Sequence, residues 1–325
     1  MSEHVIIAKD LRKRFDTVQA LQGVSFSVAA GEVFGFLGPN GAGKSTTINV
    51  ITGLAKADSG AVFVGGVDCV KNPRAAQGLI GVVPDESNLY PELTGFENLC
   101  FCAALYGLGK AQRQARAHEL LKIFALEKAA NRKFGSYSKG MKRKLTIAAG
   151  VIHRPPILFL DEPTTGIDLA SVRQIRQLIT DLNRSGTTIF LTTHYIEEAE
   201  RLCDRIAFIV SGQVLRIDSV ENLLQPARAR HVLQITASGP LEGLAGELRA
   251  AFPALAFENP ENRLLRIEAD GPVPVGPLVR FLEERGVEVV EARRLRPCLE
   301  DVFAEITGLG AETLRQDTSK SGGRA

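Results

Sequence analysis

The segment "GPNGAGKST", residues 38–46, contains the residue types that phosphate binding requires. It fits the pattern GxxxxGKS/T and lies between the apolar run "EVFGFL" and "STTINVITGL", which predicts a strand, a tight loop and a helix. Such a loop aims backbone N–H groups at phosphate oxygens, its lysine binds the β and γ phosphates, and its hydroxyl is a Mg²⁺ ligand. The alternative is a glycine-rich turn with a surface lysine. We predict a nucleotide site made of Gly38, Pro39, Asn40, Gly41, Ala42, Gly43, Lys44, Ser45 and Thr46.

Two adjacent carboxylates end a second apolar run, "ILFLDEP". In open parallel sheets, ligands bind at the carboxyl ends of the strands. There Asp161 can hold Mg²⁺ directly or through water, and Glu162 can polarise a water behind the γ-phosphate. A helix-initiating acidic pair before Pro163 is the alternative. His194 ends the run "TTIFLTTH" and is predicted to reach the γ-phosphate from a neighbouring strand, although a lone histidine is usually structural.

Length and composition set the broad class. The chain has 325 residues, 45% hydrophobic and 23% charged, which predicts a globular protein with one large and one small domain. A formal charge of +2 argues against nucleic acid as a partner. No apolar segment approaches the ~18 residues of a membrane span, and the start does not resemble a signal peptide. Five cysteines without a CxxC pair indicate reduced thiols and a cytoplasmic protein.

The spacing of apolar residues changes along the chain. Short apolar runs separated by glycine-rich turns predict strands over the first 85 residues, whereas helical spacing predicts a helical insertion at about 86–154. From residue 156 the order is strand, helix, strand, helix, strand, which implies parallel pairing. The expected fold class is therefore α/β, with a first domain over residues 1–224.

A composition shift at residues 225–230 predicts a linker. The next segment, 231–308, is expected to contain strands and helices in the order βαββαβ, followed by a closing helix at "CLEDVFAEITG". That order predicts a small ferredoxin-like α+β domain. Residues 309–325 are polar and rich in Gly and Ser, and are expected to be disordered.

The stretch "SYSKGMKRKL", residues 136–145, places four cations within six residues at the expected start of a helix. Those cations are Lys139, Lys142, Arg143 and Lys144. The helix macrodipole favours anions there, so the charges have the wrong sign unless they face a phosphate. A solvated basic face is the alternative that this stretch leaves open.

The motifs "GPNGAGKST", "YSKGM", "ILFLDEP", "TTGID" and "LTTH" resemble, in order and spacing, those of the nucleotide-binding subunit of ATP-binding cassette (ABC) transporters. The resemblance covers residues 4 to about 220. It implies a P-loop NTPase fold and ATP hydrolysis with Mg²⁺, in which Lys44, Glu162 and His194 are catalytic and Ser45 and Asp161 bind the metal.

The resemblance also implies a head-to-tail homodimer, in which the signature segment of one subunit caps the γ-phosphate held by the other. Ser138, Lys139 and Gly140 would make these contacts in trans. Asp168 resembles the D-loop aspartate, which communicates between the two sites. Phe15 resembles the aromatic residue that stacks on adenine, with core packing as the alternative.

Two positions depart from the family pattern. Lys139 replaces the first signature glycine and is expected to add a phosphate contact, with a solvated ammonium as the alternative. Asp85 stands where the Q-loop has a glutamine. A carboxylate at position 85 can still coordinate Mg²⁺. Both departures, and the closing "LEDVF", resemble the branch that exports drugs and polysaccharides.

This branch implies a separate polytopic permease that docks near the helical region after Asp85, with this chain peripheral on the cytoplasmic face of the membrane. One alternative is a soluble ABC ATPase acting on ribosomes or DNA. Another is a nucleotide-binding regulator without turnover, against which the presence of Lys44, Asp161, Glu162 and His194 together argues.

Overall fold

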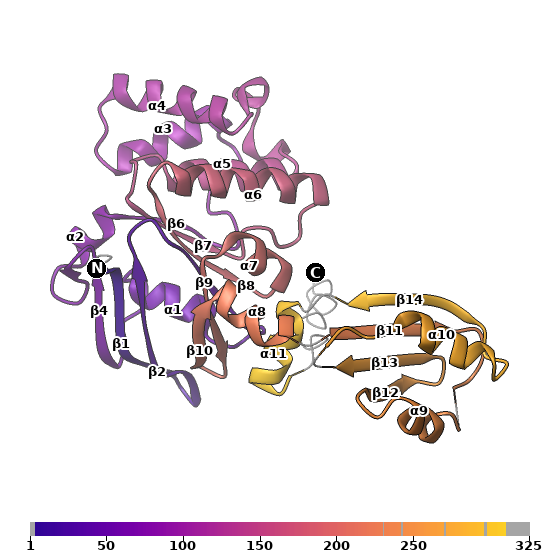
Figure 1. The fold of residues 1–325 in the computed structure, drawn as a ribbon. Coiled ribbons are helices and arrows are strands. Elements are labelled where there is room, and N and C mark those ends of the chain that lie inside the picture. The colour runs from indigo at the N-terminus through magenta and orange to yellow at the C-terminus, as the bar shows by residue number, and fades with distance from the viewer. Residues whose placement is uncertain (1–3, 230, 242, 270, 296–297, 310–325) are drawn as a thin grey trace. The chain divides into compact units, whose positions relative to one another are not determined.

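A computed structural model describes residues 4–229, 231–241, 243–269, 271–295 and 298–309 (Figure 1). The chain divides into two compact units. Among the described residues, the first comprises those up to Ser219 together with residues 306–309, and the second is Val220–Glu305. None of the helices in the described ranges combines the length and apolar character that crossing a membrane requires.

The first unit is built around a six-stranded sheet whose strand order is β10-β9-β3-β8-β7-β6. Its strands are β3 (Val33–Leu37), β6 (Ile80–Val83), β7 (Ile157–Asp161), β8 (Thr188–Thr193), β9 (Arg205–Val210) and β10 (Gln213–Ser219). All neighbours pair in parallel except β9 and β10. Every residue of β3, β7 and β8 is buried, which explains their unbroken apolar runs. The carboxyl ends of the parallel strands therefore meet at one edge.

A second sheet of the first unit is antiparallel, with the order β2-β1-β4-β5. It consists of β1 (His4–Phe15), β2 (Val18–Ala29), β4 (Ser59–Val64) and β5 (Val67–Asp68). A cluster of phenylalanines joins the two sheets, because the ring of Phe26 on β2 lies 5.5 Å from Phe34 and 5.3 Å from Phe36 on β3. Four helices complete this part: α1 (Lys44–Ile51), α2 (Pro73–Gly78), α6 (Leu169–Arg184) and α7 (Ile196–Leu202).

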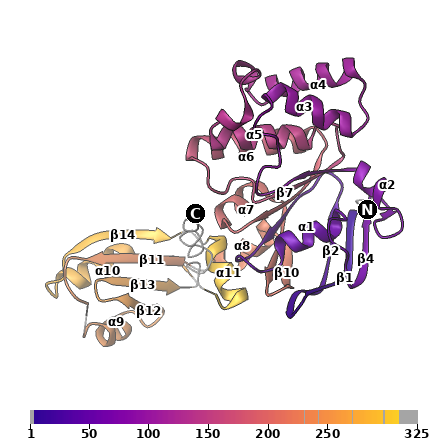
Figure 2. The ribbon, with the colours of Figure 1, turned by 180° about the vertical axis from the view of Figure 1, so that it is seen from behind.

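The segment between β6 and β7 is helical, as the apolar spacing predicted. It contains α3 (Gly95–Leu105), α4 (Lys110–Ile123) and α5 (Lys139–Gly150), with short 3-10 turns at Glu127–Ala129 and Phe134–Ser136. Figure 2 shows these helices grouped on one side of the six-stranded sheet. Thr94 starts α3 with a capping box, in which its hydroxyl accepts from the N–H of Glu97 and the Glu97 carboxylate accepts from the N–H of Thr94.

The second unit has the predicted βαββαβ order, preceded by α8 (Val220–Ala229) and followed by α11 (Leu299–Thr307). Its elements are β11 (His231–Ala237), α9 (Ala245–Ala251), β12 (Ala256–Glu261), β13 (Leu264–Ala269), α10 (Val275–Glu283) and β14 (Val289–Leu295). The sheet is antiparallel with the order β12-β13-β11-β14. Leu248, Leu278 and Leu282 from the two helices pack on Ile235 and Ile267 of the sheet.

The predicted linker is wrong where the structure describes it. Residues 225–229 belong to α8, which begins at Val220, and the two units separate after Ser219. The change in composition suggested a loop, but Leu223 and Leu224 are buried, and this burial favours a helix through the segment. Of the tail predicted to be disordered, residues 310–325 lie outside the described residues.

Candidate nucleotide-binding site

Many of the predicted site residues lie at the carboxyl edge of the parallel sheet and line a pocket of ≈ 590 Å³. The lining includes nine of the residues singled out in the sequence: Phe15, Asn40, Gly41, Gly43, Lys44, Ser45, Thr46, Asp85 and Glu162. Val18, Gln19, Ala20, Gln22 and Ser211 complete it. These residues come from β1, β2, the loop after β3, the start of α1, and the segments that follow β6, β7 and β9.

The loop between β3 and α1 needs its glycines for two different reasons. Gly41 and Gly43 have φ angles of 77° and 103°, in the left-handed region that favours glycine. Gly38 needs space, because a Cβ atom there would lie 2.1 Å from the carbonyl oxygen of Ile209. The loop is thus held tightly against β9, while Pro39 and Ala42 complete it between these glycines.

Lys44 is the first residue of α1, and its side chain is buried beneath the loop. The ammonium donates to the carbonyl oxygens of Gly38 at 2.8 Å and Pro39 at 3.2 Å. It also forms an ion pair with Glu162, with Nζ 3.1 Å from Oε1. A cation is therefore fixed where the loop and the end of β7 meet.

Glu162 is the centre of a buried polar cluster. Its Oε2 lies 2.8 Å from His194 Nδ1 and accepts from the Thr165 hydroxyl at 3.1 Å. Burial alone would raise the pKa of Glu162, but the hydrogen bond from His194 and the charge of Lys44 outweigh it and lower this pKa to about 2. Glu162 is consequently a carboxylate, so the proton on the facing His194 nitrogen must belong to the histidine.

His194 has a second ring nitrogen, Nε2, that is buried and has no hydrogen-bond partner among the described residues. A buried polar atom without a hydrogen-bond partner lowers the stability of the fold. Such an atom is typical of a site where a ligand binds. This orphaned atom and the buried ammonium of Lys44 fit the oxygens of a phosphate group.

Asp161, the last residue of β7, accepts a hydrogen bond from the hydroxyl of Thr192 on β8. The neighbouring N–H of Glu162 donates to the carbonyl oxygen of Thr192 at 3.1 Å. These contacts fix two consecutive carboxylates at the sheet edge. Glu162 itself has a φ of 47°, an uncommon conformation for a residue with a side chain and one frequent at functional sites.

Asp85 lies in the segment after β6 and is exposed, yet it also lines the pocket. Partial desolvation and the nearby carboxylates of Asp161 and Glu162 raise its pKa, while the guanidinium of Arg143 opposes the shift. The carboxylate of Asp85 therefore interacts electrostatically with Asp161 and Glu162 at the end of β7, and with Arg143.

Phe15 ends β1 at the rim of the pocket. The residue is 48% exposed, which excludes the alternative that it packs in the core. The ammonium of Lys13 lies 4.9 Å from the ring centroid. Phe15 still lines the pocket. A flat exposed ring at this place can stack on a planar base.

Ser138, Lys139 and Gly140 do not line the pocket that contains Lys44. Ser138 caps α5 by accepting from the N–H of Met141 at 3.3 Å. Gly140 packs on α6, since a Cβ there would lie 2.1 Å from Ser171 Oγ and 3.6 Å from a carboxylate oxygen of Asp168. Asp168 caps α6, accepting from the N–H and hydroxyl of Ser171, and these bonds lower its pKa. The signature segment and the predicted D-loop residue thus lie together.

The four cations of "SYSKGMKRKL" do not share one environment. Lys139 is exposed, Lys142 lies over the ring of Phe134, Lys144 donates to Gln174, and Arg143 is buried. The interpretation of the stretch as one basic group facing an anion is therefore wrong for Arg143, which turns toward backbone carbonyls of its own chain.

Sequence reasoning missed three residues that hold the site together: Arg143, Thr165 and Thr192. One signal for Arg143 was available, because Gly140, Arg143 and Ile147 repeat at helical spacing and form the buried stripe of α5. The two threonines carry no signal beyond their places at the ends of apolar runs, since any polar residue there is a candidate.

The chain resembles known proteins over nearly its whole length. A sequence profile described as "ABC transporter" matches residues 21–165. The daunorubicin resistance ATP-binding protein DrrA2 of Streptomyces coeruleorubidus is 35% identical over 311 residues, which are 95% of this chain and 96% of that one. The Nod factor export ATP-binding protein I of Burkholderia thailandensis is 36% identical over 310 residues, 95% of this chain and 98% of the relative.

A solved structure supports the same assignment. The ATP-binding cassette MJ0796, in a dimeric post-hydrolysis state bound to ADP and Pi, matches with a TM-score of 0.61 and 30% identity, over 66% of this chain and 98% of that one. The predicted P-loop ABC-type fold is thereby confirmed for the first unit.

Proposed function

The chain belongs to the ABC transporter ATP-binding family and binds and hydrolyses ATP, and we propose that this hydrolysis powers export through a separate membrane permease. In this proposal the chain acts from the cytoplasmic face of the membrane. The proposal rests on one observation: over 95% of its length the chain matches ATP-binding proteins of daunorubicin resistance and of Nod factor export. Those relatives are named for resistance to daunorubicin and for export of Nod factor.

In this proposal the predicted site residues in and around the pocket have distinct tasks. Phe15 stacks on the base, the loop from Gly38 to Thr46 surrounds the phosphates, and Lys44 neutralises them. Oxygen ligands for Mg²⁺ come from Ser45, Asp161 and Asp85, and the ion would balance charge on the phosphates. A hard cation suits this set, since all three side chains offer oxygen.

Glu162 orients and polarises the attacking water, because its low pKa keeps it ionised and able to accept a proton. His194 holds that carboxylate through Nδ1 and presents its unpartnered Nε2 to the γ-phosphate. We infer that Ser138, Lys139 and Gly140 complete the site of a second copy in a head-to-tail dimer. None of the three lines the pocket of its own chain, and Gly140 lies next to Asp168, which supports this arrangement.

The permease is expected to dock on a groove of ≈ 650 Å³ in the first unit. Its lining includes Leu54 from the α1 end, Arg74 and Gln77 from α2, and Tyr106 from the α3 end. The residues Leu54 and Tyr106 are 70% and 45% exposed, so apolar surface is available beside charge. A short amphipathic segment of a membrane protein suits such a groove.

Affinity purification from detergent-solubilised native membranes tests the proposal. The tagged Glu162→Gln protein with ATP should recover a polytopic membrane protein, since slowed turnover prolongs the ATP-bound dimer. The same preparation of Lys44→Ala serves as the control and should recover less of it. Recovery of ribosomes or DNA-bound proteins with no polytopic partner would instead support a soluble ABC ATPase.

A further inference from the structure

Arg143 of α5 is a buried cation that none of the assigned roles uses. The residue is only 7% exposed. The guanidinium donates to the carbonyl oxygens of Pro163 and Asp85, both at 2.9 Å, and also to those of Pro84 and Asp161. A single side chain therefore joins the helical segment to the backbone that follows β6 and to the backbone that follows β7.

Burying a guanidinium against backbone carbonyls needs compensation. Desolvation lowers the pKa of Arg143, and the carboxylates of Asp85, Asp161, Glu198 and Glu162 oppose this shift, so the group stays charged. Arginine suits such a place because its planar fork carries five N–H donors in fixed directions. A lysine could satisfy only part of the same set of acceptors.

The segment after β6 has two faces. Asp85 lines the nucleotide pocket, whereas Pro84 and Glu86, on either side of it, line the groove where we expect the permease. Arg143 bonds the carbonyls of Pro84 and Asp85. Any displacement of this segment by a protein in the groove must therefore move Arg143 or break its bonds.

We propose that Arg143 is a positioning residue that ties the groove-facing segment at Pro84 and Asp85 to the carboxylate pair Asp161 and Glu162, so that docking in the groove sets the rate of ATP hydrolysis. The inference rests on the proposed function for the identity of the docking protein. Its first part, the alignment of the carboxylates, concerns the isolated subunit alone. Arg143 acts through its neighbours and does not touch the nucleotide.

The test compares Arg143→Lys and Arg143→Gln with Lys142→Gln, in the full chain. Lys142→Gln is the matched control, since it removes a cation from the same helix whose ammonium lies over the ring of Phe134, a residue outside both segments. Both Arg143 variants should lose at least about tenfold in kcat with KM for ATP changed less than about threefold, because misplaced catalytic groups slow chemistry more than binding. Lys142→Gln should match the wild type.

Two further measurements separate positioning from a purely structural role. Thermal unfolding of Arg143→Lys, with and without ATP, should show a folded protein that ATP still stabilises, and stimulation of its ATPase by the co-purified permease should fall to less than half. If Arg143→Gln does not fold, Arg143→Lys decides the matter. Unchanged kcat, or losses of kcat and of ATP binding that only follow a lower Tm, would overturn the inference.

The two proposals can fail separately. If the wild type hydrolyses ATP but no polytopic protein is recovered, the transporter proposal fails while the kcat comparison still tests Arg143. If a permease is recovered and stimulates both Arg143 variants as strongly as the wild type, the coupling role of Arg143 fails and the proposed function stands.

Discussion

At the scale of single residues, the state of Glu162 depends on its partners more than on its exposure. Burial disfavours its charge, yet the hydrogen bond from His194 and the ammonium of Lys44 keep it ionised. An ionised carboxylate that two donors hold in place is suited to orient a water molecule, because its own position is fixed. The same contacts link the site to the stability of the fold.

The lowered pKa of Glu162 predicts a dependence of stability on pH. Because the folded-state pKa lies below its ordinary value near 4.5, this group stabilises the protein above that pH, and the contribution is lost as pH falls toward about 2. A shift of this size corresponds to about 3 kcal/mol. Chemical denaturation of wild type and Glu162→Gln should show a stability difference that shrinks between those pH values. A constant difference across this window would contradict the assignment.

Lys44→Ala is expected to weaken ATP binding at least about a hundredfold, since the variant removes the charge that we propose faces the phosphates and leaves Glu162 with one fewer partner. Equilibrium binding with a fluorescent ATP analogue measures the change. Lys56→Ala is the control, because Lys56 is an exposed lysine of the same unit and does not line the pocket. Equal affinity of the two variants would refute the placement of the phosphates.

At the scale of elements, the loop after β3 is held by close packing as well as by its turn. Gly38→Ala should lower Tm and abolish ATP binding, because its Cβ would overlap a carbonyl oxygen of β9 and force the backbone to shift, at about 1–3 kcal/mol. Gly78→Ala is a matched control, since a Cβ at that position would have no atom within 4 Å and the φ of Gly78 is ordinary. Thermal unfolding and ATP binding check both variants, and a well-behaved Gly38→Ala would show that the loop is less confined than described.

The cap of α3 gives a second prediction at this scale. Thr94→Ala removes both the cap of the helix and its part in the capping box, which should cost about 1 kcal/mol, whereas Thr94→Ser should keep most of that stability. Urea unfolding measures the difference. The site itself lies elsewhere, so kcat should change little; a large loss of activity would mean that this helix end is part of the catalytic apparatus.

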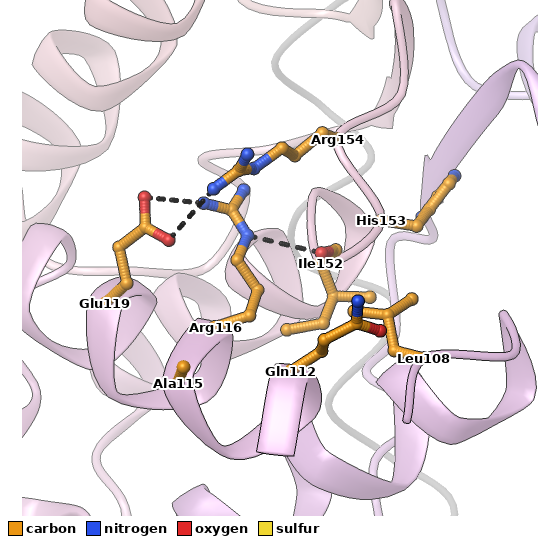
Figure 3. A pocket seen from close by; sticks show the side chains of 8 residues that line it. All are labelled: Leu108, Gln112, Ala115, Arg116, Glu119, Ile152, His153 and Arg154. Carbon is orange, nitrogen blue, oxygen red and sulfur yellow. Dashed lines mark hydrogen bonds and ion pairs between the residues drawn. The ribbon is translucent and has the colours of Figure 1, made fainter. Parts of the chain in front are cut away.

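Within the helical segment, α5 has a buried stripe and an exposed start. One stripe of α5 is buried through Gly140, Arg143 and Ile147, while Lys139 stays exposed at its start. The same region has another pocket, of ≈ 400 Å³, between α4 and the end of α5 (Figure 3). There Arg116 donates to the carbonyl oxygens of Val151 and Ile152, which satisfies the end of α5. We therefore interpret this second pocket as structural.

At the scale of the whole molecule, each unit has its own hydrophobic core. This predicts two transitions in calorimetry, of which ATP shifts only one, because the nucleotide pocket lies in the first unit alone. At a hundredfold excess over Kd the stabilisation is about 2.7 kcal/mol, which corresponds to a rise of roughly 5–10 °C for a unit of this size. Lys44→Ala should show no shift, and a single transition moved by ATP would mean that the two cores unfold together.

The sequence by itself determined the fold class, the phosphate loop, the carboxylate pair and the order of elements in the second unit. These follow from local rules, since glycine spacing, apolar runs and helical periodicity act over a few residues. Only the tertiary structure decided which residues meet. It bonded Arg143 to the backbone that follows β6 and β7, joined Glu162 to His194 and Lys44, exposed Phe15, and extended α8 through the expected linker. Contacts between distant segments depend on how sheets and helices pack, and no local pattern encodes them.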